Sequence, residues 1–273
     1  MCNILVLMCT FNRLDQTKEC IKSLFKNNDG INFNFVIVDD NSSDGTKEFL
    51  KSKDYINVIN GNGSLYYSGG MRKAIEYAKQ TLTNIDYDYV MMVNNDVKFY
   101  PNAINNLIKD SVKVGNSIVA GSTKDFNGEL SYGGFIKVSK FRPKFKHLYK
   151  EETNYFVDSC NGNCILIPAI IFKKIPNIDA KYVHSLGDYD FGFTITKLGF
   201  KIVTSSFFVG DCDSRRPFNH WKNSNLKIKE RLKILESPLG NPSSQWFYFL
   251  NKNYNIITAI LYYFNNILSA LKK

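Results

Sequence analysis

The first hundred residues alternate short apolar runs with segments whose apolar residues recur at helical spacing. Four of the apolar runs end in polar or glycine-rich turns, at residues 10–13, 39–44, 61–70 and 94–96. This alternation is typical of βαβ units and predicts an α/β fold with a mainly parallel central sheet and flanking helices. In an open α/β sheet, ligands bind outside the carboxyl ends of the strands. The sequence therefore predicts a single site at the edge where the four polar turns meet.

The pattern continues, less regularly, to about residue 215 and then changes to a basic, aromatic-rich texture. We expect strands at residues 3–10, 34–40, 56–61, 88–96, 117–122, 132–138, 162–169 and 201–210, and helices at residues 15–27, 42–52, 68–82 and 187–200. We therefore place a domain boundary near residue 215, with a first domain at 1–215 and a helical extension at 216–273.

The composition favours an ordinary globular protein. With 273 residues, of which 44% are hydrophobic, the chain can bury a large core. No apolar stretch reaches the roughly 18 residues of a membrane-spanning helix. The N-terminal segment lacks a basic region and a cleavage site and reads as a strand. Six cysteines without CxxC pairs predict reduced thiols in a cytoplasmic protein.

The charge is concentrated in the C-terminal part of the chain. Residues 215–273 contain ten Lys or Arg and two acids, a balance of +8, whereas the first 214 residues contain 25 and 23, a balance of +2. A basic tail on a nearly neutral body predicts contact with a polyanion, either nucleic acid or an anionic membrane surface. A merely soluble basic surface is the alternative.

Apolar residues at helical spacing between Ile256 and Leu271 argue against nucleic acid as the partner of the tail. They fit an interfacial helix, which would place a cytoplasmic protein peripherally on the inner face of the cell membrane. The same stripe would also result from packing on the core or against a second subunit of a homodimer.

The expected fourth strand ends in Asn94, Asn95 and Asp96. A carboxylate beside two carboxamides supplies hard oxygen ligands suited to Mn²⁺ or Mg²⁺. Such a metal would offset the charge on a departing diphosphate. Asn and Asp also occupy ordinary turns, so the triplet alone leaves both interpretations open.

The expected second strand ends in two adjacent acids, Asp39 and Asp40. Successive side chains of an extended chain point to opposite sides, so only one of the two faces inward. The inward carboxylate can accept a hydrogen bond from a nucleobase N–H or a ribose hydroxyl. These residues predict a nucleotide contact.

Gly69 and Gly70 are expected to precede a helix that carries Arg72 in its first turn. Helix N-termini favour anions, and glycine lets a phosphate approach the backbone, so these residues predict a diphosphate contact. The pattern is not GxGxxG, which disfavours a dehydrogenase. Arg72 is either a partner of the diphosphate or an ordinary solvated cation.

Three segments, VIVDDNSSDGT (36–46), GNGSLYYSGGMRKAIEYA (61–78) and MMVNNDV (91–97), occur in an order and at a spacing that resemble the inverting family 2 glycosyltransferases of the GT-A fold. Within that family the chain is most similar to bacterial rhamnosyltransferase-like enzymes of surface polysaccharide assembly. The resemblance covers residues 3–215. It implies a nucleotide-diphosphate sugar donor, dTDP-rhamnose or a UDP-sugar, and a surface-glycan or lipid-linked saccharide as acceptor.

The resemblance also implies roles for individual residues. The nucleotide would be held by Thr10, Phe11, Asn12, Arg13 and Asp39. Asp96 would take the place of the family's metal-binding last Asp, and His220 would reach the metal or the diphosphate. Asn94 replaces the first acid of the commoner Asp-x-Asp form and supplies an oxygen without a charge.

Inverting transfer needs a carboxylate that takes the proton of the acceptor hydroxyl. Asp188 and Asp190 are the candidates, and on a helix they point about 200° apart, so at most one faces the pocket. The family's Glu-Asp motif aligns its Asp with Asp188, while Gly187 replaces its Glu. We favour Asp188 as the base and assign Asp190 to acceptor orientation or to structure.

The segment at 158–168, with Asn161 and Gly162, resembles the part of the family that forms the floor of the sugar pocket. A turn before a strand explains these two residues equally well. The missing acids at Asn94 and Gly187 motivate an alternative function, a catalytically silent sugar-nucleotide-binding subunit of a polysaccharide assembly complex.

Overall fold

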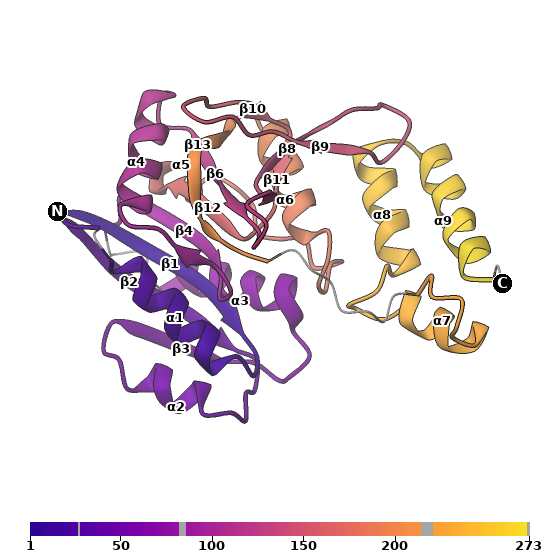
Figure 1. Cartoon of the computed structure of the whole chain (residues 1–273), viewed down its shortest axis with the longest axis horizontal. Coiled ribbons are helices and arrows are strands. Elements are labelled where there is room, and N and C mark those ends of the chain that lie inside the picture. Colours follow the sequence, from indigo (N-terminus) through magenta and orange to yellow (C-terminus); the bar gives the residue numbers. More distant parts are fainter. Residues whose placement is uncertain (27, 82–85, 214–220, 272–273) are drawn as a thin grey trace.

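The computed structural model describes residues 1–26, 28–81, 86–213 and 221–271. Within these residues a ten-stranded sheet forms the centre of the molecule, with a small three-stranded sheet beside it (Figure 1). The large sheet contains β1 (Cys2–Thr10), β2 (Ile31–Asp39), β3 (Ile56–Asn60), β4 (Tyr89–Asn94), β5 (Lys98–Phe99), β6 (Ile118–Lys124), β7 (Leu130–Tyr132), β10 (Phe156–Val157), β12 (Cys164–Pro168) and β13 (Ile202–Asp211). The small sheet contains β8 (Gly134–Lys137), β9 (Phe145–His147) and β11 (Ser159–Cys160).

Helices flank the large sheet and extend beyond it at the C-terminal end of the chain (Figure 1). They are α1 (Leu14–Leu24), α2 (Thr46–Lys51), α3 (Tyr66–Thr81), α4 (Ala103–Lys113), α5 (Ala169–Phe172), α6 (Gly187–Lys197), α7 (Ile228–Leu235), α8 (Ser243–Asn253) and α9 (Ile256–Leu271). The predicted class, an α/β fold with a mainly parallel sheet and a C-terminal helical extension, is confirmed.

The strand order along the large sheet is β10-β13-β6-β12-β4-β1-β2-β3. The strands β4, β1, β2 and β3 are parallel neighbours, as the βαβ pattern predicts. Strand β12 runs antiparallel between β4 and β6. Its sequence, CILIP, did not predict this direction, because a strand that is buried on both faces reads as a continuous apolar run whichever way it runs.

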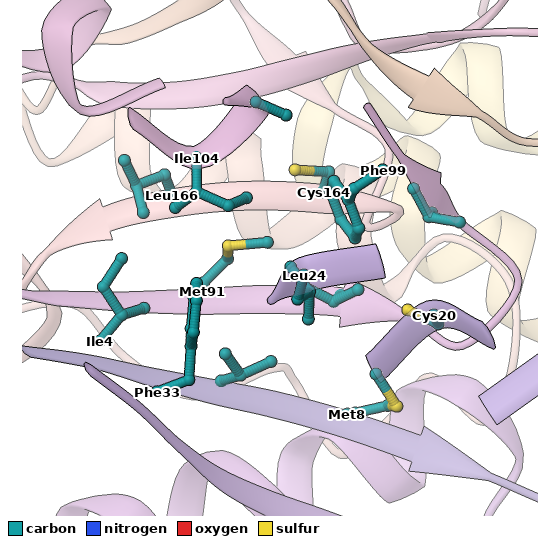
Figure 2. Close-up of a cluster of buried hydrophobic side chains, with 14 of the residues drawn as sticks. Ile4, Met8, Cys20, Leu24, Phe33, Met91, Phe99, Ile104, Cys164 and Leu166 are labelled. Carbon is teal, nitrogen blue, oxygen red and sulfur yellow. The ribbon is translucent and has the colours of Figure 1, made fainter. Parts of the chain in front are cut away.

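The two faces of the sheet are covered by separate hydrophobic clusters. Ile4, Val6 and Met8 of β1 point into one cluster with residues of α1 and α4, part of which Figure 2 shows. Leu5 and Leu7 point into the other, with residues of α3 and α6. The alternation follows from the two-residue period of a strand and fixes which strand-end side chains face which layer.

The C-terminal helices form a layer beside α6 and the small sheet (Figure 1). Phe249 of α8 packs on Phe193 of α6 with ring centroids 6.0 Å apart, and Trp246 stacks on Tyr262 of α9 at 4.8 Å. The first helix of the predicted basic extension is α7. Among the described residues, no helix is long and apolar enough to span a bilayer. All six cysteines are free.

Candidate active site

The carboxyl ends of β1, β2 and β4 lie side by side at one edge of the sheet. Thr10 pairs with Asp39 across β1 and β2, and Cys9 pairs with Asn94 across β1 and β4. The polar turns that follow these strands therefore meet at one edge, as the sequence predicts.

Asn95 ties two of these turns together. Its side-chain amide donates to the hydroxyl of Thr10 at 3.0 Å and to the hydroxyl of Thr17 at 3.1 Å. Both Asn95 and Thr10 are buried. The two side chains fasten the start of α1 and the end of β1 to the end of β4, so they shape the edge from inside the protein.

Asp40 organises the loop that precedes α3. One carboxylate oxygen accepts the N–H groups of Asn62 and Gly63 at 3.1 and 2.8 Å, and the other accepts those of Leu65 and Tyr66 at 2.8 and 3.3 Å. Both oxygens are thus engaged by backbone N–H groups. This arrangement gives Asp40 a structural role in place of the predicted nucleotide contact.

Asp39 is buried, with 1% of its surface exposed. Its Oδ2 accepts the N–H of Ser42 at 3.3 Å, while its Oδ1 has no hydrogen-bond partner among the described residues. A buried carboxylate oxygen without a donor is costly. The position therefore suits a ligand that supplies an N–H or O–H donor.

The turn after β1 is clamped to the turn after β2. Asn12, at a φ of 49°, donates its N–H to Ser42 at 2.9 Å and accepts the N–H of Ser43 at 2.8 Å through its side chain. Phe11, beside it, is 49% exposed. The clamp presents an accessible aromatic ring at the site edge, where a nucleobase could stack.

Asp96 and Arg13 form an ion pair at the same edge. The guanidinium donates to Asp96 Oδ2 at 3.0 Å, and the two side chains are 49% and 36% exposed for Arg13 and Asp96 respectively. The thiol of Cys212 approaches Asp96 Oδ1 at 3.6 Å. An exposed carboxylate and an exposed cation thus stand together at this edge of the sheet.

The donor set fits a metal ion that takes most of its ligands from outside the protein. No three His, Cys, Asp or Glu side chains converge on one point anywhere in the described chain. Asp96 offers one accessible carboxylate. Asn94, two residues earlier at the end of β4, donates its backbone N–H to the carbonyl of Asn163 at 3.0 Å. One carboxylate completed by phosphate oxygens and water is a common way to bind Mg²⁺. His220 lies outside the described residues.

Asp188 lies in the first turn of α6 and is held by two backbone donors. Its Oδ2 accepts the N–H of Gly162 and its Oδ1 the N–H of Tyr189, both at 2.9 Å. Burial raises the pKa of this carboxyl to about 6, against the lowering effect of these hydrogen bonds. Gly162 adjoins Asn163, whose carbonyl accepts the N–H of Asn94. Asp188 is therefore connected through one short loop to the end of β4.

Asp190 points away from Asp188, as the helical spacing predicts. It is 2% exposed, and it accepts hydrogen bonds from Lys252 at 2.7 Å and from the side chain of Asn253 at 2.8 Å. Both partners belong to α8. Asp190 therefore joins the C-terminal helices to α6.

The expectation that Gly69 and Gly70 precede a helix is wrong, because α3 begins at Tyr66. A Cβ on Gly70 would lie 2.7 Å from the Cβ of Cys9, so the missing side chain lets α3 pack closely on β1. The N–H of Gly69 already donates to the carbonyls of Leu65 and Val183. The two glycines therefore serve helix packing, and sequence alone does not separate this use from phosphate binding.

Arg72 holds the segment before α6 in place. Its guanidinium donates to the carbonyls of Asp179 and Tyr182 at 3.2 and 3.1 Å. It is therefore not a free helix cation, and its contact with a diphosphate stays a prediction.

The loop 161–163 connects the site to the small sheet. The side chain of Asn161 is buried. Its Oδ1 accepts a hydrogen bond from the N–H of Gly133 and lies 2.8 Å from the ring Nε2 of His147. A Cβ on Gly162 would lie 1.6 Å from the hydroxyl of Tyr67, which donates to the Gly162 carbonyl at 3.3 Å. The loop is therefore fixed by its surroundings on both sides.

Sequence reasoning missed Tyr67 and Cys212. Burial and the nearby Asp188 raise the pKa of the Tyr67 hydroxyl, which keeps it a neutral donor. Tyr67 lies within the segment 61–78 that carries the resemblance, so this motif could have identified it as a candidate site residue. Cys212 reaches Asp96 only because β13 pairs with β5, and nothing in the sequence indicates that pairing.

Two solved structures resemble this one over nearly its whole length. A mannosyltransferase from Pyrobaculum calidifontis, in complex with GDP-Man and Mn²⁺, is 11% identical and matches 98% of this chain and 72% of its own, with a TM-score of 0.58. The 1–349 fragment of S. aureus TarS, in complex with UDP-GlcNAc, is 16% identical and matches 97% of this chain and 81% of its own, with a TM-score of 0.57. At these identities the likeness establishes the fold.

No curated protein gives a significant match to this sequence. The sequence profile described as "Glycosyl transferase family 2" matches residues 5–174, a range that includes the ends of β1, β2 and β4 and the loop 161–163. The match covers more than half of the chain. The protein therefore belongs to glycosyl transferase family 2.

Proposed function

We propose that the protein transfers a sugar, with inversion, from a nucleotide-diphosphate donor to a hydroxyl of an acceptor, with Asp188 as the general base. The observation that carries this proposal is the assembly of three different carboxylates at one sheet edge. Asp39 has a buried oxygen in need of a donor, Asp96 is exposed beside Arg13, and Asp188 has a pKa of about 6. Both structural neighbours are complexes with nucleotide sugars, which supports a donor of this class.

Each carboxylate has a separate role in the proposed reaction. Asp39 accepts a hydrogen bond from the base or ribose of the donor. Asp188 takes the proton of the acceptor hydroxyl while that oxygen forms a bond to the anomeric carbon. The bond from this carbon to the diphosphate breaks on the opposite face, and the diphosphate leaves with the electron pair. The guanidinium of Arg13 would stabilise the negative charge that develops on the diphosphate.

We further propose that Asp96, with Asn94 beside it, holds Mn²⁺ or Mg²⁺ when the donor is bound. Such a metal would neutralise charge on the departing diphosphate. The Mn²⁺ in the mannosyltransferase complex supports this assignment. His220 stays a prediction as a further ligand.

The resemblance of the sequence motifs favours dTDP-rhamnose or a UDP-sugar as donor. It favours a bacterial surface glycan or a lipid-linked saccharide as acceptor. We include this donor and this acceptor in the proposal, because the family assignment alone does not specify them. We also propose a cytoplasmic location.

A second candidate function is a silent sugar-nucleotide-binding subunit, because Asn94 and Gly187 stand where related enzymes have acids. A Cβ on Gly187 would lie 2.2 Å from the hydroxyl of Ser68, so this backbone has no room for a side chain there. Release of the nucleoside diphosphate in the presence of an acceptor would eliminate this candidate.

The donor is testable by thermal shift, because a ligand that binds only the folded state raises the melting temperature. A panel of sugar nucleotides, each with and without Mn²⁺, should contain at least one that stabilises the protein. The Asp39→Asn variant should bind this donor about ten- to a hundredfold more weakly, since it loses a hydrogen bond to a charged acceptor. Mn²⁺ alone should have little effect, because the protein offers a single carboxylate at the strand end.

Asp54→Asn is the matched control, since Asp54 is an exposed carboxylate in the turn between α2 and β3. It should leave donor affinity unchanged. Equal donor affinity of the wild type and the Asp39→Asn variant would contradict the role of the Asp39 oxygen.

The pH dependence of kcat/KM tests the base. Asp188 acts as a base only when deprotonated, and its pKa of about 6 means that the protonated form dominates at lower pH. The rate should therefore fall about tenfold per pH unit below about pH 6 and level off above it. A profile without an ascending limb near pH 6 would argue against Asp188 as the group that takes the proton.

A further inference from the structure

Helix α9 turns its large apolar side chains away from the protein. The exposed residues of this helix, between 42% and 67% accessible, include Ile256, Ile257, Ile260, Leu261, Phe264, Leu268 and Leu271. Their spacing places them on one half of the helix circumference. The buried residues on the other side are small or polar, namely Thr258, Ala259, Asn266 and Ala270. A helix on the surface of a soluble domain shows the reverse arrangement, so the outer face of α9 calls for an apolar neighbour.

A second segment adds to the same surface. The loop 138–144, between β8 and β9, carries Phe141 and Val138 at 74% and 43% exposure. The hydroxyl of Thr258 donates to the Phe141 carbonyl at 3.0 Å, which joins the loop to the first turn of α9. In Figure 1 this loop reaches across toward α8 and α9. We name the exposed apolar residues of α9, with Val138 and Phe141, the apolar face.

Cations lie on one side of the apolar face, and acids are missing from its two segments. Lys140, Arg142 and Lys144 are exposed in the loop beside Phe141. Lys137 and Lys140 line a groove of about 560 Å³ together with Asn253 and Tyr254, between the loop and the junction of α8 and α9. Residues 137–147 and 256–271 contain no Asp or Glu.

We propose that the apolar face binds the surface of an anionic lipid bilayer. The aliphatic and aromatic side chains would enter the boundary between headgroups and acyl chains, while the cations would meet lipid phosphates. A lipid surface supplies the apolar interior and the negative charge together. A second copy of the chain fits less well, because the contact would bring the cations of the loop 138–144 in both copies close together.

This proposal goes beyond the proposed donor, because it concerns the orientation of the enzyme relative to a membrane that presents the acceptor. Strand β1 runs from the N-terminus toward the side of the molecule on which α7–α9 lie (Figure 1). The carboxyl end of β1 therefore points toward the half of the molecule that contains these helices. An acceptor presented by a bilayer would approach from that side.

Co-sedimentation with vesicles tests the proposal, with phosphatidylcholine vesicles that contain about 30% phosphatidylglycerol as the probe. The full-length protein should bind them, and should bind pure phosphatidylcholine about tenfold or more weakly. The Leu261→Ser/Phe264→Ser variant should bind the anionic vesicles about a hundredfold more weakly, because two large apolar side chains no longer enter the bilayer. The Lys140→Gln/Arg142→Gln variant should bind the anionic vesicles about tenfold more weakly than the wild type. This difference should be smaller at high salt, because salt screens the attraction between the cations and the lipid phosphates.

The matched control is Val112→Ser/Ile170→Ser, which removes two side chains of 58% and 66% exposure on α4 and α5. These helices lie at the other end of the molecule (Figure 1), so vesicle binding should not change. Donor-induced thermal stabilisation, measured for every variant, shows that the site remains folded and separates this test from that of the proposed function.

Three results would overturn the proposal. The first is that the wild-type protein fails to bind anionic vesicles, or binds neutral ones equally well. The second is that the Leu261→Ser/Phe264→Ser variant binds like the wild type. The third is a wild-type dimer in sedimentation velocity that this variant dissociates, which would make the apolar face a contact between two copies of the chain.

Discussion

Replacing Asp188 with Asn is expected to lower kcat by about three orders of magnitude, the usual size of a general-base contribution. The carboxamide keeps the shape of the side chain but has no basic oxygen for the proton of the acceptor hydroxyl. It still accepts one of the two N–H groups that hold Asp188, from Gly162 and Tyr189, so the fold should persist. Donor affinity should stay close to that of the wild type, because the proposed nucleotide contacts lie at the ends of β1 and β2.

The measurement is single-turnover transfer at saturating donor, with donor binding followed in parallel by calorimetry. Asp190→Asn is the control, a change of the same kind two residues further along α6. It should retain most of the activity. Wild-type rates in the Asp188→Asn variant would remove Asp188 from the mechanism, and a loss of donor binding would assign it a binding role.

Replacing Asp190 with Ala should destabilise the protein by about 2–3 kcal/mol. Removing one partner of a fully buried ion pair costs about 3–5 kcal/mol, and a smaller loss is expected here because the Lys252 side chain is 32% exposed and can recover some hydration. The Asn253 amide also loses its acceptor. The change would loosen α8 from α6 while leaving the residues at the strand ends in place.

Urea denaturation measures this loss as a change in the free energy of unfolding. Asp179→Ala is the matched control, because Asp179 also contacts Lys252, at 3.2 Å, but is 26% exposed. Its loss should be smaller, about 1 kcal/mol or less. Unchanged stability together with lost transfer in the Asp190→Ala variant would reverse the roles that we give to the two acids.

The first half of the fold was predictable because its sequence signals are local. The apolar runs and helical spacings before Asn94 correspond to β1, α1, β2, α2, β3, α3 and β4 in that order. The direction of β12 was not predictable, since it depends on pairing with β4 and β6, which are distant in the sequence. The spacing of apolar residues predicts whether a segment is a helix or a strand, but it does not predict which strands that segment pairs with.

The candidate site was predictable to the level of motifs. The two-residue period of β2 predicts that Asp39 and Asp40 face opposite ways, but the fold decides which of them meets the loop 62–66. The same holds for Asp188 and Asp190, whose difference depends on the docking of α8. Gly70 was misread for a related reason. A glycine that lets a phosphate approach the backbone and a glycine that lets a strand pack closely on a helix cannot be distinguished in the sequence.

The hydrogen bond between the Gly162 N–H and Asp188 makes the strength of the base depend on the position of a loop. A donor to a carboxylate stabilises its charged form and lowers its pKa. Because Tyr67 on one side and Gly133 on the other hold the loop 161–163, this donor stays in place. The folded chain would then set the proton affinity of the base before any substrate arrives.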